Sequence, residues 1–303
     1  MKLTDLQVNG YAGVDFSSSE LSESDFVSAC AKLVKHGVNA FLPTVITSSE
    51  AVYKRNLSLI ARMSENVEIK NHILGIHAEG PFISNKSGAV GAHNPEWTKE
   101  PNIDFLKKMQ EWSNGKIKIL TIAAELPNAE KVCEYATRTG ISVFLGHQDA
   151  QLSDLERLAD AGAKAITHLG NGMPNMVNRH DNILQYSLVC DKLAATIITD
   201  GHHLPAHLIK TIIKAKGIDK IAIISDASPV AGMPPGKYQI LGNDAILEEN
   251  GLLHNPTKNC MVGSSATMVE CVKYMDSLGI LTKEQLQKVV YHNPLKLINL
   301  QTA

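Results

Sequence analysis

Short apolar runs alternate with longer amphipathic segments along almost the whole chain. Eight runs are rich in Ile, Val and Ala, as is typical of strands buried on both faces, and they cover residues 2–8, 38–42, 72–77, 117–123, 141–145, 165–168, 193–199 and 221–225. The segments between them repeat apolar residues at helical spacing and cover residues 24–36, 49–63, 102–112, 129–139, 153–161 and 205–215. Two further helical segments, 266–278 and 283–290, close the chain.

Strands that alternate with helices predict a parallel sheet, and eight such units favour a closed barrel over an open sheet. The pattern therefore predicts an α/β fold, a (β/α)8 TIM barrel that spans residues 1–303 as one domain. The one break in the alternation is residues 236–254, which predict a β-hairpin inserted after the eighth strand.

Composition narrows the choice of function. The 29 Lys and Arg residues nearly balance the 31 Asp and Glu residues, so charge gives no reason to expect a nucleic acid or an anionic membrane as partner. No apolar run is long enough to predict a membrane span, and no signal peptide is expected. The five cysteines are far apart and include no C-x-x-C pair, which predicts free thiols and a cytoplasmic location.

Unusual polar residues follow most of the predicted strands. In a TIM barrel the catalytic groups lie at the carboxyl ends of the strands, and Glu79, His147 and His168 occupy such positions. A single histidine or aspartate there is more often a hydrogen-bonded structural residue or a helix cap, but their joint occurrence favours a metal site. His and carboxylate ligands suit Zn²⁺, Fe²⁺ or Co²⁺ and leave a position open for water. Asp226 follows the eighth strand and could accept and return a proton.

The chain resembles the N-acetylglucosamine-6-phosphate deacetylases, a family of the metal-dependent amidohydrolase superfamily. The resemblance rests on nine strings in family order that run along nearly the whole chain: DLQVNGYAGVDF (5–16), HAEGPF (77–82), GAHNP (91–95), GH (146–147), THLGNGMP (167–174), TDGHH (199–203), SDA (225–227), VGSSATM (262–268) and NP (293–294).

The resemblance implies specific roles for these residues. Glu79, His147 and His168 would bind one divalent metal ion, Zn²⁺ before Fe²⁺ or Co²⁺, and Asp226 would be the general base and acid. His93 would lie by the acetamido group and help to polarise its carbonyl.

The resemblance also implies how a sugar phosphate is held. Asn171, the backbone around Gly172, Arg179 and His203 would bind it. Arg179 and His203 would reach the site from the neighbouring subunit, which implies a homodimer.

Gln7 and Asn9 stand where many amidohydrolases place a His-x-His pair for a second metal. Amide side chains are poor ligands for Zn²⁺, so a single-metal site is expected. Two roles stay open for this pair: contact with the substrate, or orientation of a water or a metal ligand.

The function that the resemblance implies is deacetylation of N-acetylglucosamine 6-phosphate to glucosamine 6-phosphate and acetate. Family members usually carry a small β-sandwich built from both chain ends, and we expect the present sequence to lack it. Ala89-Val90 replaces a basic pair of the family, and Arg179 lies in an unusual Asn-Arg-His-Asp context. An amidohydrolase acting on another N-acyl amino sugar or an N-acyl amino acid is therefore an alternative, and a non-catalytic sugar-phosphate-binding protein is another.

Overall fold

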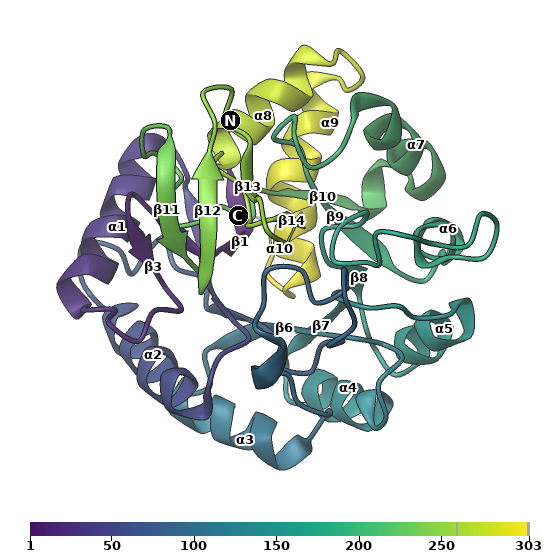
Figure 1. Cartoon of the computed structure of the whole chain (residues 1–303), viewed down its shortest axis with the longest axis horizontal. Helices are drawn as coiled ribbons and strands as arrows, with labels where there is room; N and C mark the ends of the chain where they lie inside the picture. Colours follow the sequence, from purple (N-terminus) through teal and green to yellow (C-terminus); the bar gives the residue numbers. More distant parts are fainter. Residues whose placement is uncertain (259, 302–303) are drawn as a thin grey trace.

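The computed structural model describes residues 1–258 and 260–301, and its centre is a barrel of eight parallel strands (Figure 1). The strands pair in the order β1, β4, β5, β6, β7, β8, β9, β10. Their bounds are Thr4–Val8 (β1), Ala40–Ile46 (β4), Ile76–Glu79 (β5), Ile117–Ile122 (β6), Ser142–Leu145 (β7), Ala165–Ile166 (β8), Ala194–Ile198 (β9) and Ile221–Ile224 (β10). All eight overlap the predicted strands, and the predicted TIM barrel is confirmed.

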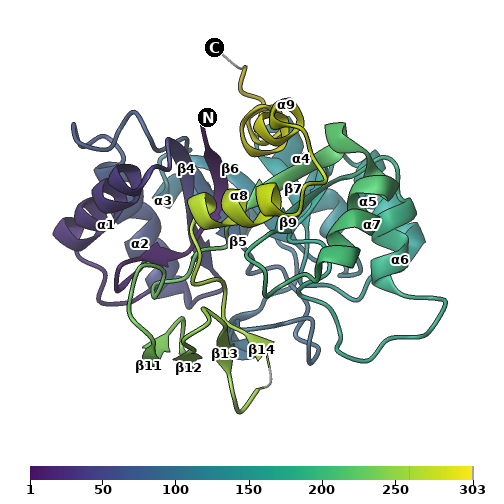
Figure 2. The ribbon, with the colours of Figure 1, turned by 90° about the horizontal axis from the view of Figure 1, so that it is seen from above.

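Helices form the outer ring of the barrel, and the last of them lie across its end near the chain termini (Figures 1 and 2). They are Glu23–His36 (α1), Glu50–Met63 (α2), Ile103–Trp112 (α3), Ala129–Arg138 (α4), Leu152–Asp160 (α5), Ile183–Val189 (α6), Ala206–Lys216 (α7), Met268–Ser277 (α8), Lys283–Gln287 (α9) and Asn293–Leu297 (α10). The sequence pattern missed α6, a helix of seven residues behind a long polar loop. The last predicted helix is also longer than expected, because a π-helical turn at Lys288–His292 joins α9 to α10.

Local signals explain where the helices begin and end. In α1 the side chain of Ser22 accepts a hydrogen bond from the amide of Asp25, which satisfies a free donor of the first turn. The helix ends at Gly37, whose φ of 118° lies in a region that residues with a Cβ atom rarely adopt.

The barrel closes where β1 meets β10. The Asp5 carboxylate accepts hydrogen bonds from the backbone amide and the hydroxyl of Ser225. The backbone amide of Asn9 donates to the carbonyl of Ala227 at 2.7 Å. These bonds fix the strand ends on either side of Asp226. An apolar layer that includes Leu6, Leu42, Ile119, Phe144, Ile198 and Ile224 fills the barrel below them.

The insertion after the eighth strand is larger than the predicted hairpin. It forms a four-stranded antiparallel sheet of Gly236–Ile240 (β11), Asn243–Leu247 (β12), Leu253–Asn255 (β13) and Cys260–Met261 (β14). Two short strands, Gly10–Tyr11 (β2) and Val14–Asp15 (β3), pair nearby. Figure 2 shows the four-stranded sheet at the end of the barrel opposite α9 and the chain termini. It therefore covers part of the face where the barrel strands end.

Among the described residues, no helix is both long enough and apolar enough to cross a membrane.

Candidate active site

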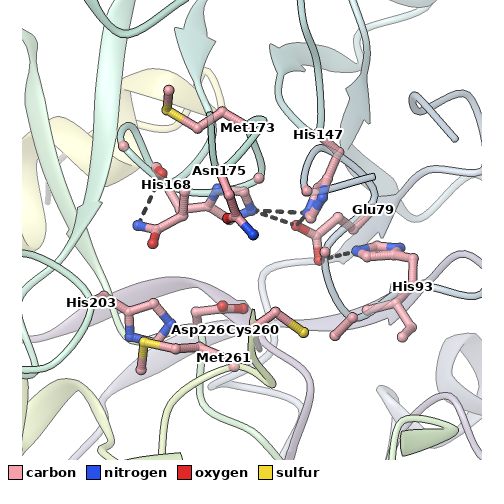
Figure 3. A pocket seen from close by; sticks show the side chains of 18 of the residues that line it. Glu79, His93, His147, His168, Met173, Asn175, His203, Asp226, Cys260 and Met261 are labelled. Carbon is pink, nitrogen blue, oxygen red and sulfur yellow. Dashed lines mark hydrogen bonds and ion pairs between the residues drawn. The ribbon is translucent and has the colours of Figure 1, made fainter. Parts of the chain in front are cut away.

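Three predicted metal ligands meet at the carboxyl ends of the strands (Figure 3). Glu79 is the last residue of β5, and His147 and His168 each follow a strand by two residues. All three side chains are buried, and their ligand atoms lie within 4.8 Å of one another. The structure thus brings together the predicted cluster from three separate strands.

The distances inside the cluster fit one metal ion. Glu79 Oε1 lies 3.2 Å from His147 Nε2 and 3.0 Å from His168 Nε2, and the two nitrogens are 3.1 Å apart. Ligand atoms around a tetrahedral Zn²⁺ with bonds of about 2.0–2.1 Å are separated by about 3.3 Å. The cluster needs only a small expansion to hold the ion.

The hydrogen bonds of His147 also fit a metal ligand. Its Nδ1 lies 2.8 Å from the carbonyl of Ala89, and because a carbonyl can only accept, Nδ1 carries the proton. In a neutral ring, Nε2 then carries a lone pair that faces the Glu79 carboxylate. Two such electron-rich groups repel each other, and a cation between them would make the contact favourable. Nδ1 of His168 is buried and has no partner in the described part of the chain.

The charge of Glu79 depends on its neighbours. Burial alone would raise the pKa of this carboxyl, but its contacts with His147, His168 and His93 hold the pKa well below its usual value. Glu79 is therefore ionised in a buried position, which suits a divalent cation.

Three of the site residues have strained backbones. His147, His168 and Asp226 adopt φ values of 50°, 32° and 52°, in the left-handed region that non-glycine residues seldom occupy. Such strained conformations are concentrated at functional sites, where they hold side chains in the positions that binding or catalysis requires.

Asp226 lies across the barrel mouth from the cluster (Figure 3). Its Oδ1 accepts hydrogen bonds from Gln7 Nε2 at 2.9 Å and from Asn9 Nδ2 at 2.7 Å. Gln7 Nε2 also donates to Glu79 Oε1 at 2.8 Å. Of the two roles left open for the amides, the geometry favours orientation of the site carboxylates for Gln7, whereas Asn9 also lines the pocket.

Two effects raise the pKa of Asp226: burial comes first, and the negative charge of Glu79 adds to it. The hydrogen bond from Asn9 opposes this increase. A carboxylate with a raised pKa is better suited to exchange protons near neutral pH.

His93 lies beside Glu79, with Nε2 3.8 Å from Glu79 Oε2. Its Nδ1 accepts a hydrogen bond from the amide of Thr47 at 3.3 Å, so a neutral ring carries its proton on Nε2. Burial and the neighbouring His147 hold the pKa of His93 well below its usual value. His93 is therefore a neutral hydrogen-bond donor that points into the site.

His203 departs from the expectation that it crosses from a neighbouring subunit. It lines the pocket of its own chain, on the side opposite His93 (Figure 3). Its Nδ1 lies 2.7 Å from Asp200 Oδ2, which also accepts a hydrogen bond from Ser264. Asp200 follows β9 by two residues and turns the His203 ring toward the pocket.

The loop after β8 contributes other predicted residues. Asn171 and Gly172, which the resemblance predicts to bind the sugar phosphate, line the pocket. A Cβ at position 172 would lie 2.9 Å from His168 Cε1 and 3.1 Å from His147 Nδ1, so only glycine leaves room for the cluster. Arg179 lies further along the same loop, exposed and outside the pocket lining of its own chain.

His77 has a structural role. Its Nδ1 faces the carbonyl of Leu6 and its Nε2 faces the hydroxyl of Thr121, at 3.0 and 2.8 Å. Burial lowers the pKa of His77 to about 4, so the ring is neutral.

These residues surround a pocket of about 440 Å³ at the barrel mouth. Sequence reasoning missed part of its lining: Met173, Asn175, Val177, Cys260 and Met261. It also gave Asp200 no role, although its spacing of three residues from His203 at a strand end was a usable signal.

The fold and the cluster define a TIM-barrel protein with a His₂–carboxylate site at its strand ends, an arrangement typical of metal-dependent hydrolases. No family model matches the chain. A Bos taurus protein named N-acetylglucosamine-6-phosphate deacetylase is 31% identical over 309 residues, which cover 98% of this chain and 73% of the relative. The present chain therefore belongs to the N-acetylglucosamine-6-phosphate deacetylase family, which confirms the resemblance seen in its sequence.

Two further comparisons agree. A relative of the same name from Lysinibacillus sphaericus is 29% identical over 298 residues, which cover 97% of this chain and 76% of the relative. The crystal structure of N-acetylglucosamine-6-phosphate deacetylase from Pasteurella multocida superimposes with a TM-score of 0.87 at 27% identity, and covers 98% of this chain and 76% of that chain. The chain thus matches about three quarters of its relatives' length.

Proposed function

We propose that this protein is a metal-dependent hydrolase that converts N-acetylglucosamine 6-phosphate into glucosamine 6-phosphate and acetate. The observation that carries the proposal is the cluster of Glu79, His147 and His168 facing Asp226 across one pocket. The names of the relatives point to the substrate.

Glu79, His147 and His168 would hold a single divalent ion, and Zn²⁺ suits this donor set best, ahead of Fe²⁺ or Co²⁺. When bound, the ion would polarise the acetamido carbonyl and lower the pKa of a water molecule. Gln7 holds the Glu79 oxygen that faces both histidines, so it orients this ligand.

Asp226 would move the proton. Because Oδ1 accepts the hydrogen bonds of Gln7 and Asn9, Oδ2 is the oxygen left to take a proton from the attacking water. The same oxygen then returns this proton to the nitrogen of the amide as the C–N bond breaks. One residue thus acts first as base and then as acid.

His93 would stabilise the negative charge that develops on the carbonyl oxygen. Its neutral ring keeps a proton on Nε2, because Nδ1 accepts from Thr47. A fixed donor aimed at the developing charge typically contributes about 10²- to 10³-fold to the rate.

The sugar phosphate would lie toward Asn171, Gly172 and His203, which line the pocket. Of these, His203 lies on the side away from His93 (Figure 3). We further propose a cytoplasmic homodimer in which Arg179 reaches the partner's pocket. Two observations support the dimer: Arg179 lies outside its own pocket, and nearby Met176 is 90% exposed. The free cysteines support a reducing compartment.

The proposal is tested with purified, metal-loaded protein and a substrate panel. Acetate release is measured from N-acetylglucosamine 6-phosphate, from the unphosphorylated sugar and from an N-acetyl amino acid. We expect turnover of the phosphorylated sugar, and an Asp226→Asn variant should lose it. Acetate release from none of these compounds would refute the proposal.

A further inference from the structure

A second cavity, of about 750 Å³, lies beside the candidate active site. Two apolar residues, Ile46 and Leu241, line both cavities. Ile46 is the last residue of β4, and Leu241 lies in the turn between β11 and β12. They belong to one hydrophobic cluster under the four-stranded sheet, so together they form a partition between the two spaces.

The partition is held in a fixed position. The amide of Leu241 donates to the Asp15 carboxylate at 2.9 Å, which ties the turn of the inserted sheet to β3. Ile46 and Leu241 are almost fully buried, at 5% and 9% exposure. The wall is therefore one side chain thick but well anchored.

This wall lies next to the group that would bind the amide carbonyl. The amide of Thr47, the residue after Ile46, donates to His93 Nδ1, and Ala92, the residue before His93, also lines the pocket. A carbonyl oxygen directed at His93 places the amide nitrogen toward Asp226 and the sugar toward His203, on the far side of the pocket (Figure 3). The remaining substituent, the carbon chain of the acyl group, then meets the apolar wall.

Resting on the proposed function, we propose that Ile46 and Leu241 determine acyl-chain specificity. They leave space for an acetyl group and exclude longer N-acyl groups from the second cavity. Removal of the Leu241 side chain beyond Cβ would join the two cavities and admit a longer chain.

The test compares N-acetyl- and N-butanoyl-glucosamine 6-phosphate in the metal-loaded protein. In hydrophobic pockets, discrimination by one methylene is about 10- to 200-fold in kcat/KM, so the unaltered protein should prefer the acetyl compound by at least about tenfold. Leu241→Ala should reduce this preference by about tenfold or more, and Ile46→Ala should act in the same direction. Because the ratio of kcat/KM values is taken within one preparation, a loss of folded protein cancels.

Leu247→Ala is the matched control. Leu247 is a buried leucine of the same sheet and cluster, but it lines neither cavity. A preference that falls in Leu241→Ala and stays constant in Leu247→Ala supports the inference. An equal change in both variants, no change in Leu241→Ala, or a parent protein that hydrolyses both compounds equally would overturn it. A parent protein that releases no acetate would instead refute the proposed function, and this inference with it.

Discussion

The hydrogen bonds that hold the Asp226 carboxylate can be tested by the change Asn9→Ala. Asn9 Nδ2 donates to Asp226 Oδ1 at 2.7 Å, and this is the only hydrogen bond of the Asn9 side chain in the described part of the chain. The variant therefore removes a single donor to an ionised acceptor. Such a bond contributes about 1.5–3 kcal/mol.

The direction in which the pKa of Asp226 moves depends on which form of the carboxyl the Asn9 donor stabilises. Asn9 favours the ionised carboxylate and lowers the pKa of Asp226 against the effect of burial, so its removal raises that pKa. Because the proposed base must be ionised, the acid limb of the kcat/KM profile should move to higher pH, by about 1 to 2 pH units when 1.36 kcal/mol corresponds to one unit. Activity at high pH should change less than activity at low pH.

The assay is kcat/KM from acetate release between pH 5 and 9, with bound metal and thermal unfolding measured on the same samples. The metal content should stay unchanged, because Asn9 makes no hydrogen bond to Glu79, His147 or His168. Asn56→Ala removes a buried asparagine remote from the site and controls for lost stability. An unmoved acid limb together with a raised KM would contradict this role and assign Asn9 to substrate contact.

Three further variants test other parts of the structure. Glu79→Gln should reduce bound metal from about one ion per chain to a small fraction by elemental analysis, and a chelator should then no longer lower its unfolding temperature. Asp200→Asn should free the ring of His203 and reduce kcat/KM by about 10- to 100-fold with the metal retained. Lys216→Met removes the hydrogen bonds of the ammonium to the carbonyls of Ser187 and Cys190, of which, among the described residues, only the Cys190 carbonyl keeps another donor, the amide of Leu193. It should lower the free energy of unfolding in urea by about 1–3 kcal/mol, without changing kcat/KM.

The barrel could be predicted from the sequence because buried parallel strands are nearly continuous apolar runs. The eight runs lie within a few residues of the observed strands. The inserted sheet was harder to predict, because β13 and β14 have three and two residues and are defined by pairing rather than by composition. Short strands of this kind carry too few side chains to show a period.

The candidate metal-binding cluster could also be predicted, because the strand ends of a parallel barrel converge at one face independently of the loops. The groups that set its chemistry could not. The carbonyl of Ala89 and the amide of Thr47 fix the His147 and His93 tautomers, and backbone groups leave no trace in the sequence. The position of His203 depends on its own loop, which folds back onto Asp200.

The left-handed backbones of His147, His168 and Asp226 imply a trade-off between stability and function. Each such conformation costs on the order of 1–3 kcal/mol, which the rest of the barrel must offset. A glycine at any of these three positions would relieve the strain and remove the functional side chain in one step. Selection for a more heat-resistant barrel alone would therefore tend to erase the proposed catalytic centre, and a stable, inactive descendant lies only one substitution away.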